Sequence, residues 1–155
     1  MGLINKSSMF PEGIIRLHNG TVDYDTGRPI RAILVLDSFL DTTFIETNRD
    51  AFDFVNDIPA ADRATSLFKA LGTNDIVKDA TNDNVNFSPG TVNLTYPTVT
   101  SGNACRGVVV FKSDTGGEAT SPLLCYANFT ASVAADGGTV TVTLNADGIF
   151  RVSYD

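Results

Sequence analysis

The sequence predicts a mainly β protein, an antiparallel β-sandwich with one or two short helices. Three observations support this fold class. Short runs in which apolar and polar residues alternate fill the second half of the chain, from residue 85 onward. Turn-forming glycine, asparagine and aspartate separate these runs at short intervals. The 155 residues, 43% of them hydrophobic, suffice for one domain with its own core.

The first forty residues predict an arm followed by three strands. Residues 1–12 are mostly small and polar, and we expect them to form an N-terminal arm. Residues 13–17 and 21–24 are expected to be strands joined by the turn Asn19-Gly20. The near-continuous apolar run over residues 30–36 predicts a strand that is buried on both faces.

The middle of the chain predicts two short helices and a loop. Asn48 is followed by an acidic first turn, which is typical of a helix start and predicts a helix over residues 48–56. Residues 61–71 predict a second helix, because apolar residues recur there at helical spacing and Gly72 offers a C-cap. The Asn- and Asp-rich run 74–84 predicts a loop.

The rest of the chain predicts strands and turns. Residues 92–96 and 140–144 alternate strictly between apolar and polar, so each predicted strand has one buried face. A tight turn is expected at residues 145–148. The full set of strands expected in this half covers residues 85–87, 92–96, 104–111, 123–130, 140–144 and 149–154.

Residues 104–130 predict a long hairpin with a polar connector. With its centre near Thr115, residues whose numbers add up to about 230 face each other. Cys105 and Cys125, the only two cysteines, then lie on opposite positions of paired strands. Opposed Cβ atoms lie about 4.5–5.5 Å apart, which exceeds the usual spacing in a disulfide. Two buried thiols are therefore favoured over a disulfide, and both states stay open.

Charge and hydropathy narrow the classes of partner. The formal net charge of −7 and the sequence pI of about 4.5 argue against duplex DNA and anionic membranes as partners. No window approaches the roughly 20 apolar residues of a membrane-spanning helix. The N-terminal residues do not resemble a secretion signal, so we expect synthesis in the cytoplasm without export.

Three motifs contain residue types found at catalytic or metal sites, and none predicts such a site. Asp-Thr-Gly occurs at Asp25 and Asp114, as in aspartic proteases, but neither aspartate directly follows an apolar strand and both fit polar turns. Asp23 and Asp25 begin like a calcium loop that lacks its third acid and its distal glutamate, which leaves only a weak surface site. His18 is the only histidine, stands beside a turn and is expected to be exposed. We therefore assign no catalytic, cofactor-binding or metal-binding residue, and we expect no enzyme activity and no cofactor.

Three segments resemble small structural proteins of tailed bacteriophages. The first is the hairpin over residues 110–126, in which a strand is followed by Lys-Ser-Asp-Thr-Gly-Gly, further polar residues, Ser-Pro-Leu and a strand ending at Tyr126. The second is Asn145-Ala146-Asp147-Gly148-Ile149-Phe150, and the third is the apolar strand that ends in Asp37-Ser38. The spacing of these segments is also similar. Between residues 57 and 90 the chain departs from the family, whose members carry a Gly-Tyr segment there.

The resemblance implies a virion component, most specifically a head decoration or cement protein that bridges and stabilises capsid subunits. It implies the major capsid protein as partner, self-association as a dimer or trimer, and location in the phage particle after synthesis in the host cytoplasm. The expected organisation is an arm, residues 1–12, and one β-sandwich domain, residues 13–155, with the arm and the loop 114–121 as candidate interfaces. The alternatives are a tail, neck or fibre-base component, or a small carbohydrate-binding β module, although the chain has no Trp and four Tyr for stacking on sugars.

Overall fold

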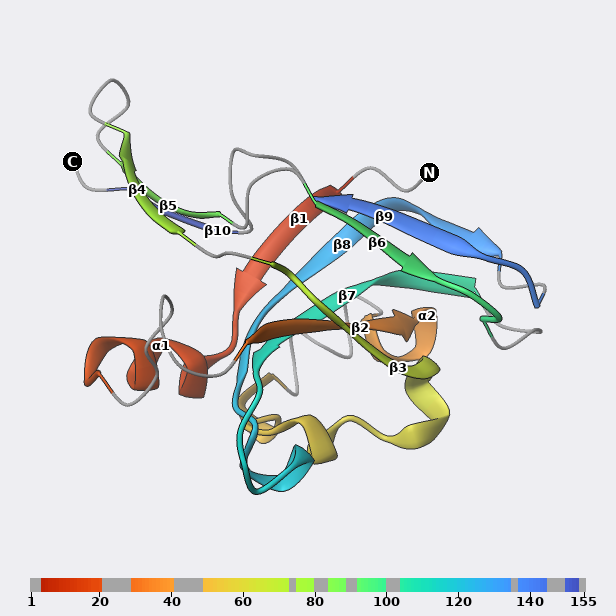
Figure 1. The fold of residues 1–155 in the computed structure, drawn as a ribbon, viewed down its shortest axis with the longest axis horizontal. Helices are drawn as coiled ribbons and strands as arrows, with labels where there is room; N and C mark the ends of the chain where they lie inside the picture. Colours follow the sequence, from red (N-terminus) through yellow and green to blue (C-terminus); the bar gives the residue numbers. More distant parts are fainter. Residues whose placement is uncertain are drawn as a thin grey trace.

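The structure, a computed structural model, confirms the predicted mainly β, antiparallel fold. Figure 1 shows its strands as one large sheet, a two-stranded ribbon and a small three-stranded sheet. The structure describes residues 4–20, 29–40, 49–72, 75–79, 84–88, 92–99, 104–134, 137–144 and 150–153.

The central sheet has five strands in the order β1-β8-β7-β2-β3, and every neighbouring pair is antiparallel. The predicted apolar strand over residues 30–36 is confirmed as β2, and it is buried along most of its length because it lies inside this sheet. The five strands are β1 (Ile4–Met9), β8 (Leu123–Ala134), β7 (Ala104–Lys112), β2 (Ile30–Leu36) and β3 (Arg63–Ala70).

The two smaller sheets consist of short antiparallel strands. The ribbon pairs β6 (Val92–Tyr96) with β9 (Val140–Leu144). The other sheet has the order β10-β5-β4, with β10 (Phe150–Ser153), β5 (Asn84–Ser88) and β4 (Asp75–Asp79). In Figure 1 this three-stranded sheet stands at the upper left, away from the ribbon.

One hydrophobic core lies between the central sheet and the β6–β9 ribbon. Leu34, Val108 and Phe129 of the sheet meet Leu94 and Val142 of the ribbon there, and all five are buried. The strict alternation of the two ribbon strands therefore predicted their buried faces correctly. This packing of a ribbon on a sheet is the predicted sandwich.

A second core covers the opposite face of the sheet. Ile33 and Val109 project from the sheet into a layer that contains Phe39 and Val55, and all four are fully buried. That layer is formed by the short helix α2 (Asp37–Leu40) and the 3-10 helices η1 (Arg49–Ala51), η2 (Val55–Asp57) and η3 (Ala60–Asp62). Because both faces are covered, the central sheet is a rigid platform for the loops at its ends.

The N-terminal prediction was wrong in two places. Within the expected arm, residues 4–9 form β1, which pairs with β8 at the sheet edge. Main-chain hydrogen bonds hold such an edge strand, so an apolar pattern is not required. The expected strand at residues 13–17 lies instead in helix α1 (Pro11–His18), which begins on Pro11. Asn-Gly serves here as the helix end, with Gly20 at φ +72°. The return strand at 21–24 lies outside the described residues.

The middle of the chain differs most from the prediction. The helix expected over 48–56 is reduced to η1 and η2, and the helix expected over 61–71 is strand β3. Main-chain pairing with β2 overrides the helical spacing, because β3 completes the sheet edge. The loop expected over 74–84 contains β4 and the start of β5. The turn expected at 145–148 lies outside the described residues, and β10 pairs with β5.

The 104–130 hairpin is confirmed, but its predicted register was wrong. Cys105 lies opposite Val133 and Cys125 lies opposite Val110, so the two cysteines do not face each other. The register differs because the connector is centred later than Thr115, and because β7 and β8 are irregular near both cysteines. Both cysteines are buried free thiols.

Candidate functional site

The loop between β7 and β8, residues 113–122, is the candidate functional site. Its tip is exposed at Asp114, Thr115, Gly116 and Gly117, and again at Ala119 and Thr120 within the 3-10 helix η4 (Glu118–Thr120). Ser121 and Pro122 are buried at its base. The sequence-predicted interface 114–121 is thus a polar loop with an exposed tip and a buried base.

Hydrogen bonds within the loop fix its shape. The buried hydroxyl of Ser121 donates to the carbonyl of Gly117 at 2.6 Å and accepts the N–H of Asp114 at 3.0 Å. Gly117 has φ +82°, a conformation that side-chain-bearing residues rarely adopt. The N–H of Gly117 also donates to the carbonyl of Asp114 at 3.3 Å. Ser121 therefore closes the loop from below.

A second segment, residues 53–55, pairs with the base of the loop. The N–H of Leu123 donates to the carbonyl of Asp53 at 2.9 Å, and the N–H of Val55 donates to the carbonyl of Ser121 at 3.0 Å. Phe54 and Pro122 form an antiparallel bridge between these two bonds. Figure 1 shows the two segments side by side at the bottom of the view. The loop thus rests on a short piece of added strand.

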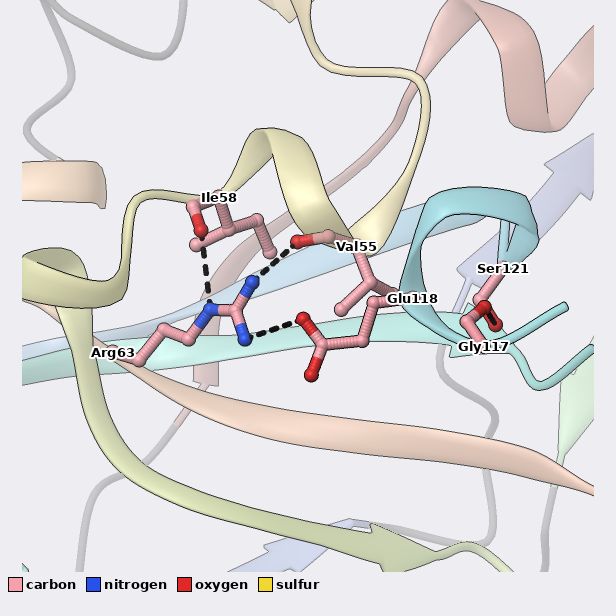
Figure 2. A network of polar contacts seen from close by, with 6 residues as sticks. All are labelled: Val55, Ile58, Arg63, Gly117, Glu118 and Ser121. Atoms are coloured by element: carbon pink, nitrogen blue, oxygen red, sulfur yellow. Dashed lines mark hydrogen bonds and ion pairs between the residues drawn. The ribbon is translucent and has the colours of Figure 1, made fainter.

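Arg63 joins the loop to residues 55–58 through three hydrogen bonds (Figure 2). Its Nε donates to the carbonyl of Ile58 at 3.1 Å, and one terminal nitrogen donates to the carbonyl of Val55 at 2.8 Å. The other terminal nitrogen lies 2.7 Å from Oε2 of Glu118 in η4. The Arg63 side chain is 14% exposed and that of Glu118 is 43% exposed. A planar guanidinium suits this role because its donors diverge in fixed directions.

Acidic residues lie within and next to the segment 53–55 that supports the loop. Oδ2 of Asp57 accepts the N–H groups of Asp53 and Phe54 at 2.9 and 2.8 Å, which fixes the start of η2. The pKa of Asp53 is raised, mainly by burial and further by the charges of Glu12 and Asp57, while Arg16 opposes the shift. The ionised form of the Asp53 carboxyl group is therefore less stable in the folded protein than in water.

A pocket of about 280 Å³ lies between the loop and the end of the central sheet. The sheet contributes Arg31, Phe68 and Phe111 from β2, β3 and β7, and Arg31 is paired directly with Phe111. The two phenylalanine rings meet edge to face, with centroids 5.1 Å apart. The loop contributes Ser113, Asp114, Gly117, Glu118 and Ser121.

Of the remaining sequence-predicted residues, the structure describes Asp114 and His18. Asp114 lies at the exposed loop tip, where its Oδ1 accepts hydrogen bonds from the N–H and hydroxyl of Thr115. Asp23 and Asp25, the proposed calcium residues and the second Asp-Thr-Gly, lie outside the described residues. His18 is exposed at the end of α1, as predicted. Within the described ranges, no three His, Cys, Asp or Glu side chains are grouped to hold a metal ion.

The two thiols are buried in the core, and neither lines the pocket beneath the loop. Burial raises the pKa of Cys105 to about 11, with the charge of Asp37 adding to the shift. Burial also raises the pKa of Cys125 strongly. Both residues are therefore core side chains with little thiolate at neutral pH.

Sequence reasoning missed the residues that shape the site. Arg63 and Phe68 lie in the segment predicted as a helix, and Arg31 lies in an apolar run that indicates a buried strand and no site. No local signal identifies Arg63, because its partner Glu118 is 55 positions away.

Comparisons with known proteins return no match: no family model, no curated protein and no solved structure matches this chain. No helix in the described part of the chain is long and apolar enough to span a membrane.

Proposed function

We propose that the protein is a non-enzymatic structural protein that docks onto a protein partner through the β7–β8 loop, residues 113–122. The observation that carries this proposal is the bracing of an exposed polar loop by Arg63 and by residues 53–55. A loop that is already ordered loses little conformational entropy on binding, so its contacts contribute more fully to affinity.

The finer assignment is a head decoration protein of a tailed bacteriophage that bridges subunits of the major capsid protein. It rests on the resemblance of residues 110–126 and 145–150 to tailed-phage structural proteins. The central sheet supports this assignment, since a sheet packed on both faces keeps its conformation when a partner binds the attached loop. Strand β1, at the sheet edge, offers main-chain groups for strand addition, either to the capsid or to a second copy.

Sedimentation with empty phage heads tests the assignment. The purified protein should pellet with heads and remain in the supernatant without them, while light scattering on the free protein gives its oligomeric state. Recovery with isolated tails alone would replace the head assignment by the tail, neck or fibre-base alternative. Binding to neither particle would refute the virion assignment.

A matched pair of variants tests the loop. Ala119 is exposed in the loop and Ala131 is exposed on β8, so each accepts an arginine without disturbing the core. Ala119→Arg should weaken head binding at least about tenfold, which corresponds to about 1.4 kcal/mol. Ala131→Arg should leave binding unchanged. Equal effects from both variants would contradict docking through the loop.

A further inference from the structure

We propose that the pocket beneath the β7–β8 loop binds a neutral polyhydroxylated ligand, a single sugar ring of a glycan. The inference goes beyond head docking and rests on the pocket alone. With about 280 Å³, the pocket is slightly smaller than typical small-molecule sites, whose volumes begin at about 300 Å³. It therefore fits one ring rather than an extended chain.

The charges around the pocket balance, which argues against an ionic ligand. Arg31 and Asp114 both line it, and so does Glu118, whose charge is offset by Arg63 at 2.7 Å. Two carboxylates and two guanidinium groups leave no net local charge. An added ion would therefore gain little Coulomb energy while losing its hydration.

An apolar ligand fits the same pocket poorly. It would cover the Arg31 guanidinium without offering it an acceptor, and removing a charged group from water without a new hydrogen bond is costly. The ligand must therefore carry an acceptor for Arg31, and a donor beside it suits the carboxylate oxygens on the loop side of the pocket. A sugar hydroxyl does both at once, as the hydroxyl of a serine does.

The geometry of the lining also suits a sugar ring. Donors at Arg31 lie on the sheet side, and the carboxylates lie on the loop side, where the second oxygen of Glu118 points away from Arg63 (Figure 2). Phe68, which is partly exposed, forms an apolar part of the wall with Phe111. A pyranose has the same division, with hydroxyl groups at its edge and C–H groups on its face, and aromatic rings attract such C–H groups weakly.

The test is a titration of the isotopically labelled full chain followed by amide NMR shifts. The probes are glucose, galactose, mannose, N-acetylglucosamine and rhamnose, with N-acetylarginine methylamide and inorganic phosphate as ionic comparators. At least one sugar should shift the amides of Arg31, Ser113 and Gly117 in a saturable way. Shifts from an ionic probe alone, or from no sugar at all, would overturn the proposal.

Variants locate the binding. Arg31→Met should lower sugar affinity about tenfold or more, because a hydrogen bond to a charged group is lost. Lys69→Met is the matched control, since Lys69 follows Phe68 on β3 and so projects from the opposite face of the sheet. Ser113→Ala, with an expected loss of about threefold to tenfold, replaces Arg31→Met if that variant does not fold. Equal affinities of wild type and pocket variants would refute the assigned site. Head sedimentation should be unchanged in the Arg31 variant, which separates this proposal from the docking proposal.

Discussion

Replacing Arg63 by methionine tests the bracing of the β7–β8 loop directly. Methionine retains most of the apolar stem and removes the three guanidinium nitrogens that make these hydrogen bonds. The carbonyls of Val55 and Ile58 then lose a charged donor at 2.8 and 3.1 Å in a site where Arg63 is only 14% exposed. The Ile58 carbonyl loses the donor that Arg63 supplies, which costs about 1–3 kcal/mol, reduced where water enters. The Val55 carbonyl still accepts the N–H of Ile58 at 3.1 Å, so it loses one of two hydrogen bonds, about 0.5–1.5 kcal/mol. The Glu118 ion pair adds at most about 1 kcal/mol, because Glu118 is 43% exposed.

We therefore expect Arg63→Met to lower the free energy of unfolding by about 2–4 kcal/mol, measured by urea denaturation with an unchanged m-value. For a chain of this size the loss corresponds to a decrease in Tm of roughly 5–15 °C. Glu118→Gln is the control, because it removes the charge and retains an acceptor, and it should cost less than about 1 kcal/mol. If Glu118→Gln destabilised as much as Arg63→Met, the two carbonyl bonds would not be the main contribution and the reasoning would be wrong.

Three further predictions concern packing, thiol chemistry and pH. Gly13→Ala should lower the free energy of unfolding by about 1–3 kcal/mol, because the alanine Cβ would lie 2.6 Å from the carbonyl oxygen of Leu123. Thermal unfolding measures the effect, and an unchanged Tm would mean that helix α1 shifts to make room for the methyl group. Cys105 and Cys125 should resist iodoacetamide at pH 8 in the native protein and react together on unfolding. A pKa of about 11 at Cys105 leaves roughly one thiolate in a thousand at pH 8. Rapid labelling of the native protein would contradict the burial of the two thiols. The folded-state pKa of Asp53 is raised above 3.8, so its contribution to stability is present below pH 3.8 and is lost as pH rises through the folded-state pKa. Asp53→Asn should therefore stabilise the protein at pH 7 in urea denaturation, and this gain should vanish near pH 3.5. A gain that grows at low pH would mean that the pKa of Asp53 is lowered on folding, opposite to the shift that burial causes.

The sequence predicts those strands whose side chains decide their position. Residues 30–36 are apolar throughout because β2 is covered by a core on each face. Residues 140–144 alternate because β9 has one face in the first core and one face in solvent. In both cases the apolar pattern of the sequence follows from which faces of the strand are buried, so the prediction is correct.

The failures lie where main-chain pairing decides the structure. Residues 61–71 have helical spacing, yet β3 has an exposed Leu67 and pairs through its backbone with β2. Residues 4–9 show no apolar stripe, yet β1 adds to the edge of the sheet at β8. Edge strands are specified by the neighbour that they pair with, and a single sequence does not reveal that neighbour.

The register error in the hairpin has a physical cause that also explains the candidate site. A symmetric turn at Thr115 would have placed Ser121 and Pro122 within the paired strands. Instead the N–H of Lys112 donates to the carbonyl of Pro122 at 3.1 Å, and Ser121 turns its hydroxyl back toward Gly117. Ser121 can then offer its carbonyl to Val55 of the supporting segment. The displacement of the turn toward β8 is thus what attaches the loop to its brace. A register predicted from the hairpin alone omits the partner segment, and with it the contacts that shape both the docking loop and the pocket beneath it.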